Sequence, residues 1–135
     1  MKRRLIRAGS FIVVGSAAAA VHLGVVMALV EGWRLAPLRA NVLGWLVAFV
    51  VSFLGQWRLT FRDRQAPLVR AARRFFTLSL LGFAINQSAY ALALHLSGWR
   101  YDILLAAVLL GVAVMTYLLG SRWAFRGNGP VDSSR

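Results

Sequence analysis

Residues 8–30 read AGSFIVVGSAAAAVHLGVVMALV, and this stretch decides the fold class. Only three polar side chains, Ser10, Ser16 and His22, interrupt its 23 residues. A helix of about 20 predominantly apolar residues crosses the hydrocarbon core of a bilayer, which is roughly 30 Å thick. The stretch therefore predicts a transmembrane helix.

A basic segment at residues 2–4 and the alanines at 17–20 together imitate a secretory signal with a small-residue cleavage site. The apolar run continues past these alanines to Val30, so it is long enough to span the membrane. We therefore predict that the helix is retained.

Three further stretches meet the same length requirement, at residues 40–57, 75–94 and 103–121. The chain of 135 residues is 59% hydrophobic and 15% charged, whereas an ordinary soluble domain is about half apolar and about a quarter charged. Too little polar surface is left to cover a water-exposed globule. We predict an all-α fold: one membrane domain over residues 1–135, built as a bundle of four transmembrane helices.

The charges are distributed unevenly about these spans, within a formal net charge of +12. The N-terminus, the segment between the second and third spans and the C-terminal segment together carry +11, and the two other connections carry +1. Because cytoplasmic loops collect Lys and Arg, this bias predicts a multi-pass protein of the cytoplasmic membrane with both termini in the cytoplasm. Most tryptophans fall near predicted span ends, where the ring favours the interface; the five are Trp33, Trp45, Trp57, Trp99 and Trp123.

An internal repeat emerges when residue n is placed over residue n + 64. His22 then aligns with Asn86, and a matching segment with two arginines closes each unit. We predict two parallel helical-hairpin repeats, at about 8–62 and 72–126, followed by a polar tail at 127–135. Two units of the same orientation are related by an axis along the membrane normal.

The two hairpins resemble the GtrA-like family of small bacterial membrane proteins. In the first unit the likeness lies in FIVVG at residues 11–15 and SFLGQWRLTF at residues 52–61. In the second it lies in Arg74-Phe75, Asn86 and YLLGSRWAF at residues 117–125. The chain departs from the family pattern at His22, where an acidic residue is usual, and at Gln56, where Asn is usual.

The resemblance implies a role in moving polyprenyl-phosphate-linked sugars across the cytoplasmic membrane for cell-surface polysaccharide. A phosphate headgroup needs cations at the cytoplasmic interface, and the arginine fork engages phosphate oxygens in pairs. One pair of arginines closes each repeat, which makes them candidates for headgroup binding: Arg58, Arg62, Arg122 and Arg126. Topology alone also favours arginine at these positions.

A sugar that crosses the membrane interior needs hydrogen-bonding partners, and polar residues inside a membrane are functional candidates because they are costly there. The candidates for a membrane-embedded polar path are His22, Asn86, Gln87 and Gln56. Hydrogen bonding between helices is the structural alternative, and it is the favoured interpretation for Gln56.

Small residues recur every four positions along two spans, at 44, 48 and 52 and at 16, 20 and 24. Such stripes let helix backbones approach, either within one chain or between chains. Because four spans form a thin wall around a large substrate, we expect a homo-oligomer that contacts membrane lipids and the lipid-linked sugar.

Two other functions compete with transport of a lipid-linked sugar. A non-transporting partner that anchors or positions a membrane glycosyltransferase is hard to separate from it by sequence. A small drug/proton antiporter is disfavoured, because all four carboxylates lie at span ends or in loops: Glu31, Asp63, Asp102 and Asp132.

The composition also disfavours several kinds of chemistry. The chain has no cysteine, only two histidines and four acids, so we expect no cofactor, no metal site and no enzymatic activity. Nucleic-acid binding is not expected, because the positive charge flanks the spans instead of gathering on a soluble module.

Overall fold

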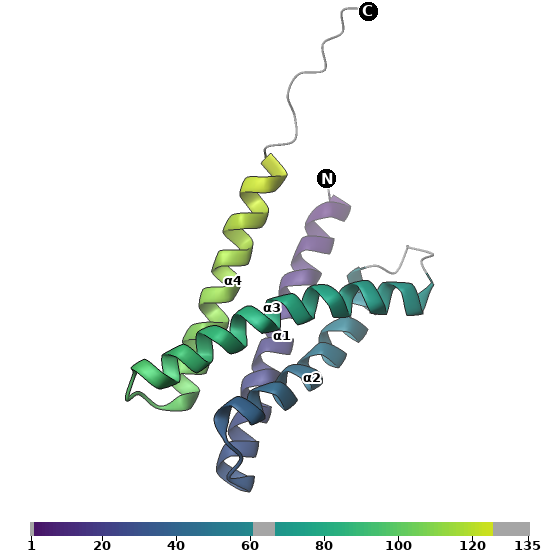
Figure 1. Cartoon of the computed structure of the whole chain (residues 1–135). Coiled ribbons are helices and arrows are strands. Elements are labelled where there is room, and N and C mark those ends of the chain that lie inside the picture. Colours follow the sequence, from purple (N-terminus) through teal and green to yellow (C-terminus); the bar gives the residue numbers. More distant parts are fainter. Residues whose placement is uncertain (1, 61–66, 126–135) are drawn as a thin grey trace, which may run out of the picture.

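The computed structural model describes residues 2–60 and 67–125, and within these residues the regular secondary structure is entirely helical (Figure 1). There are four α-helices and one π-helical segment: α1 (Lys2–Trp33), α2 (Pro37–Gly55), η1 (Gln56–Thr60), α3 (Leu68–Leu96) and α4 (Tyr101–Phe125). η1 continues α2 directly. The all-α fold of four helices is therefore confirmed.

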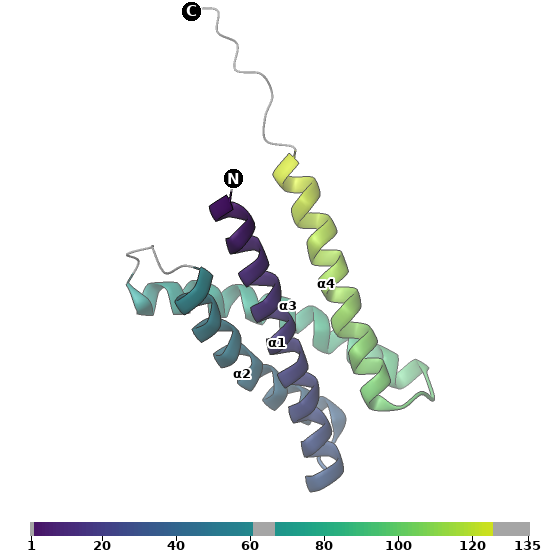
Figure 2. The same ribbon diagram turned by 180° about the vertical axis from the view of Figure 1, so that it is seen from behind.

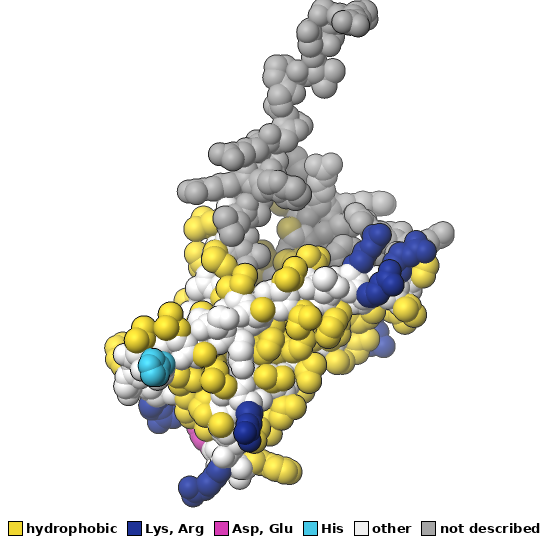
Figure 3. Space-filling model, in the orientation of Figure 1, with side chains coloured by type: hydrophobic (Ala, Val, Ile, Leu, Met, Phe, Trp, Pro, Cys, Tyr) yellow, Lys and Arg dark blue, Asp and Glu magenta, His cyan; other side chains and the backbone are white. Residues whose placement is uncertain are grey.

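Three segments are long and apolar enough to cross a membrane: Ala8–Trp33, Pro37–Leu59 and Leu68–Leu96. α4 adds a shorter apolar segment, Tyr101–Met115. Many large apolar side chains face outward (Figure 3). Such a surface suits a bilayer, where it faces hydrocarbon. In water the same surface would promote aggregation.

The helices form two antiparallel hairpins, α1 with α2 and α3 with α4, joined by connections at residues 34–36 and 97–100. We call the end of the molecule that holds these two connections the turn end. The start of α1 and the end of α4 lie together at the opposite end, with α1 and α4 on one side of the bundle and α2 and α3 on the other (Figure 2).

The first connection is tight for a reason visible in its backbone. α1 ends where Arg34 adopts a positive φ of 53°, and the Leu35 N–H donates to the Leu29 carbonyl at 3.1 Å. Pro37 then opens α2, a position where its missing N–H costs nothing. The chain thus reverses within three residues.

The first hairpin is closed by glycines of α2 that meet valines of α1. A Cβ on Gly44 would lie 2.7 Å from a methyl group of Val26, and one on Gly55 would lie 2.7 Å from a methyl group of Val14. The α2 stripe of small residues therefore packs within the chain. The α1 stripe at residues 16, 20 and 24 is exposed, and α1 instead buries the face of Val14, Ala18, His22 and Val26.

Aromatic rings join α2 to α3. Phe49 meets Phe76 edge to face with ring centroids 5.3 Å apart, and Trp45 stacks on Phe83 with centroids 4.6 Å apart. Trp45 is buried, and its indole N–H donates to Ser79 Oγ at 2.9 Å. Trp45 is therefore part of the packing between α2 and α3, whereas Trp33 and Trp99 are well exposed at the turn end.

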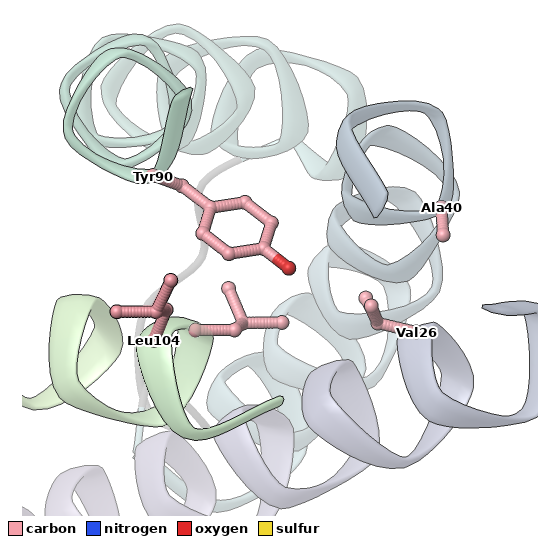
Figure 4. Close-up of a cluster of buried hydrophobic side chains, with 5 residues drawn as sticks. Val26, Ala40, Tyr90 and Leu104 are labelled. Atoms are coloured by element: carbon pink, nitrogen blue, oxygen red, sulfur yellow. The ribbon is translucent and has the colours of Figure 1, made fainter. Parts of the chain in front are cut away.

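The apolar core lies toward the turn end, where all four helices meet. Tyr90 of α3 reaches in between its neighbours, near Val26 of α1 and Leu104 of α4 (Figure 4). Its hydroxyl donates to the Tyr101 carbonyl at 3.0 Å. The cluster comprises Val26, Ala40, Tyr90, Leu104 and Leu105.

These buried positions recur at the interval of 64 residues. Val26 corresponds to Tyr90, Ala40 to Leu104, and Asn41, which is also fully buried, to Leu105. Equivalent positions of the two hairpins thus share one core, as a repeat would predict. A common origin of the hairpins stays a prediction.

Candidate functional site: a buried polar cluster

Four polar side chains from three helices meet in the interior, and we call them the buried polar cluster: His22, Asn41, Asn86 and Gln87. His22 shares the buried face of α1, and Asn41 lies in the second turn of α2. Asn86 and Gln87 come from α3. The cluster therefore joins the first hairpin to the second.

Asn41 is the centre of the cluster. Its Nδ2 donates to Asn86 Oδ1 at 2.9 Å and to Gln87 Oε1 at 2.7 Å. Its Oδ1 lies 2.7 Å from His22 Nε2. Because a carboxamide oxygen can only accept, the Nε2 atom of His22 carries the hydrogen in this arrangement.

A further hydrogen bond holds Gln87 in place, because its Nε2 donates to the Leu38 carbonyl at 3.0 Å. One donor of the cluster is unpaired in the described residues: Asn86 Nδ2 is buried and has no hydrogen-bond partner among them. A buried donor without an acceptor is costly. Asn86 Nδ2 is therefore a buried donor that the described contacts leave unused.

The chemistry of the cluster is that of neutral amides and an imidazole. These groups exchange hydrogen bonds with hydroxyl groups, and the cluster contains no carboxylate. In the part of the chain that the structure describes, no three His, Cys, Asp or Glu side chains are grouped as metal ligands would be. The arrangement suits binding of a polar, uncharged group.

Of the four residues predicted to form a polar path, the structure brings three together: His22, Asn86 and Gln87. Gln56 lies apart, at the junction of α2 and η1, and its Nε2 donates to the Phe11 carbonyl at 3.4 Å. Gln56 thus ties α2 to α1, in line with its structural interpretation.

Sequence reasoning missed Asn41 as a candidate site residue. It was visible as a polar residue in an otherwise apolar stretch, but it lies near a span end, where an amide can reach water. Only the pairing of α2 with both α1 and α3 shows that it is fully buried.

The structure describes only some of the arginines predicted to bind the headgroup. Arg58 lies in η1 and is exposed. Arg62 and Arg126 lie outside the described residues, and Arg122 is part of α4 without a described side chain. Whether these arginines form one site per repeat stays a prediction.

A second polar group links the hairpins at the turn end. Tyr101 donates to Glu31 at 2.7 Å, and Arg100 pairs with Asp102 at 3.1 Å. The hydrogen bonds from Arg100 hold the pKa of the Asp102 carboxyl below its ordinary value. Arg100 lies in the connection that precedes α4, and Asp102 lies in the first turn of α4.

A comparison with protein families agrees with this architecture. The family described as GtrA/DPMS, transmembrane domain, matches residues 10–125. No curated protein and no solved structure matches the chain.

Proposed function

Since the chain belongs to the GtrA/DPMS transmembrane-domain family and is a membrane protein, we propose that it moves a polyprenyl-phosphate-linked sugar across the cytoplasmic membrane. The transported sugar would serve the synthesis or modification of cell-surface polysaccharide. The protein itself supplies a path and performs no chemical reaction on the sugar.

The buried polar cluster is the observation that carries this proposal. A sugar hydroxyl that leaves water must exchange its hydrogen bonds for others, because an unpaired polar group in hydrocarbon costs several kcal/mol. Amides from α2 and α3 and the imidazole of α1 supply such partners at one place. Asn86 Nδ2 is the donor already available there.

The cluster is otherwise closed, because its members hydrogen-bond to one another. Transport therefore requires that α3 move relative to α1 and α2, so that the sugar hydroxyls replace the bonds of Asn41. Because hydrogen bonds between amides are exchanged for hydrogen bonds between amides and hydroxyl groups, the free-energy cost of opening the cluster stays small.

The charge distribution supports an orientation for this path. The arginine-rich segment between the two hairpins and both termini face the cytoplasm in our proposal. The lipid-linked sugar then meets a positively charged end of the protein, and its phosphate stays there while the sugar enters the bundle.

Vesicles that contain only this protein and a polyprenyl-phosphate sugar test the proposal. We expect the protein to accelerate movement of the headgroup between leaflets, measured by its accessibility to a reagent added outside. Gln87→Leu should slow the movement about tenfold, the equivalent of about 1.4 kcal/mol in the barrier. Ser88→Ala is the matched control, because Ser88 is exposed and donates only to the Ala84 carbonyl of its own helix.

The closed state of the cluster also favours a second candidate, a non-transporting partner that positions a membrane glycosyltransferase. Polar groups that satisfy one another are what a rigid scaffold needs. In that case the vesicles show no acceleration, and the protein raises the activity of a co-purified glycosyltransferase in detergent, where no translocation takes place.

A further inference from the structure

The two hairpins differ at the end away from the turns. In α1 and α2 close contacts extend from Val26 against Gly44 to Val14 against Gly55, near the end of α2. In α3 and α4 the described contacts lie toward the turn end, around Tyr90. Beyond them the two helices diverge (Figure 1). Away from the turn end, α3 and α4 therefore spread apart, whereas α1 and α2 stay in contact at Val14 and Gly55.

A hollow of about 400 Å³ lies on α3 in its first turns, and its lining is mainly apolar. The described residues that line it are Arg73, Arg74, Thr77 and Leu78. Leu78 stands 64 residues after Val14, the residue that closes the first hairpin, yet Leu78 is 69% exposed. The hollow thus lies beside Leu78, whose counterpart Val14 is buried against Gly55 in the first hairpin.

The cations of this hollow are available to a ligand. Neither Arg73 nor Arg74 forms an ion pair with a described carboxylate, and both are exposed. Thr77 donates its hydroxyl hydrogen to the Arg73 carbonyl at 3.0 Å, so the two guanidinium groups are the donors. Basic side chains gather over this part of α3 (Figure 3). Two arginines that can each engage oxygens in pairs suit a phosphate group.

An apolar stripe continues from the arginines along the same face of α3. Leu78, Leu81 and Ile85 follow Arg74 at steps of four, three and four residues, and all three are exposed. From Arg74 to Ile85 the stripe extends about 16 Å along the helix, at about 1.5 Å per residue. A cationic head followed by an apolar stripe matches a lipid better than a free phosphate ion.

We propose that Arg73 and Arg74 hold the phosphate of a phosphate-bearing lipid in this hollow, with its hydrocarbon chain along Leu78, Leu81 and Ile85. The proposal deepens the proposed function, on which it rests for the identity of the lipid as a polyprenyl phosphate. It places the phosphate on α3, at a site separate from Arg58 in η1.

Binding of a long-chain polyprenyl phosphate to the full-length protein in detergent tests this site. We expect Arg73→Gln with Arg74→Gln to weaken binding at least about tenfold, since two charge-assisted contacts are lost. The matched control is Arg34→Gln with Arg39→Gln, which removes two exposed arginines nearer the turn end and should leave the affinity within about twofold. Unchanged binding in the first double variant would overturn the proposal.

Two further probes separate the possible ligands. The corresponding polyprenol, which lacks the phosphate, should bind equally to the protein and to the Arg73/Arg74 double variant. Inorganic phosphate should compete weakly, and competition as strong as that of the lipid would overturn the role of the apolar stripe. Arg73→Lys with Arg74→Lys keeps the two positive charges. If this variant binds the lipid better than the double glutamine variant does, the loss of affinity in the glutamine variant is not due to a folding defect.

The outcome is distinguishable from that of the flipping experiment. If the lipid binds through Arg73 and Arg74 but the vesicles show no translocation, the proposed function fails and the site stands. If translocation occurs but the affinity for the lipid is unchanged in the Arg73/Arg74 double variant, the proposed function stands and the proposed site is wrong.

Discussion

Asn41 is the residue whose loss would change the interior most, because three other polar side chains depend on it. Asn41→Leu keeps a similar volume but leaves His22, Asn86 and Gln87 without their shared partner. We expect a loss of about 1 kcal/mol or more in the free energy of unfolding, given that hydrogen bonds between membrane helices contribute about 0.6–2 kcal/mol each.

The measurement is the midpoint of detergent-induced unfolding followed by circular dichroism. Val42→Ala is the control, since Val42 is the next residue and is exposed. An unchanged midpoint in Asn41→Leu would show that the cluster contributes nothing to stability.

Gly44 provides a sharper test of close helix packing. A Cβ there would lie 2.8 Å from His22 Cδ2 and 3.0 Å from the His22 carbonyl oxygen. Because backbone cannot move aside as a flexible side chain can, Gly44→Ala should destabilise the protein by about 1–3 kcal/mol.

Gly24→Ala is the matched control, because nothing lies within 4 Å of a Cβ at Gly24. The same unfolding midpoint should be unchanged or slightly raised, because alanine favours the helix. Equal effects of the two substitutions would contradict the packing described for the first hairpin.

At the scale of the elements, the aromatic contacts between α2 and α3 set how these two helices meet. Phe49 lies within 5.7 Å of Phe75 and 5.3 Å of Phe76, measured between ring centroids. Phe49→Leu retains an apolar side chain but removes the ring interactions, each of which contributes about 0.5–1.5 kcal/mol. We expect unfolding at a lower detergent fraction, with a loss of about 1 kcal/mol or more.

The control for this prediction is Val50→Leu, on the exposed side of the same helix. It should leave the unfolding midpoint unchanged. If Phe49→Leu also leaves the midpoint unchanged, the ring contacts of Phe49 contribute nothing measurable to the packing of α2 against α3.

The sequence predicts the existence of the helices better than it predicts which of their faces are buried. Length and apolarity are local, so all four helices could be predicted, although α1, α3 and α4 extend beyond the predicted spans. Which face of a helix is buried depends on its partner. Phe11, Gly15, Ala18 and His22 share one helix face by their spacing, yet of these four only Ala18 and His22 are buried, with Val14 beside them.

The site shows the same limit in a different form. His22, Asn86 and Gln87 could be selected because polar side chains are costly in a membrane. Their meeting at Asn41 depends on the crossing of three helices, which no spacing within one helix reveals. Likewise, the divergence of α3 from α4 away from the turn end depends on how the two helices cross, which neither helix reveals by itself.

For the whole molecule, the proposed orientation can be read out by labelling. The sequence contains no cysteine, so each introduced cysteine reports on one position. Trp33→Cys and Trp99→Cys place thiols on exposed sites at the turn end, and Val69→Cys places one at the exposed start of α3.

In intact cells a membrane-impermeant maleimide should label the first two cysteines, and Val69→Cys should react only after permeabilisation. The basis is the excess of arginine around the segment that joins the two hairpins. The reverse pattern of labelling would invert the orientation, and with it the direction from which the lipid headgroup meets the protein.

The position of Asn41 also has a consequence for how the chain enters the membrane. The first hairpin can close on its own glycines, but the two hydrogens of Asn41 Nδ2 find their acceptors only on α3. During synthesis, when only the first two spans have inserted, the Asn41 side-chain amide lacks its acceptors Asn86 and Gln87. Insertion of the third span satisfies this amide, so biogenesis of the first hairpin is completed by the second.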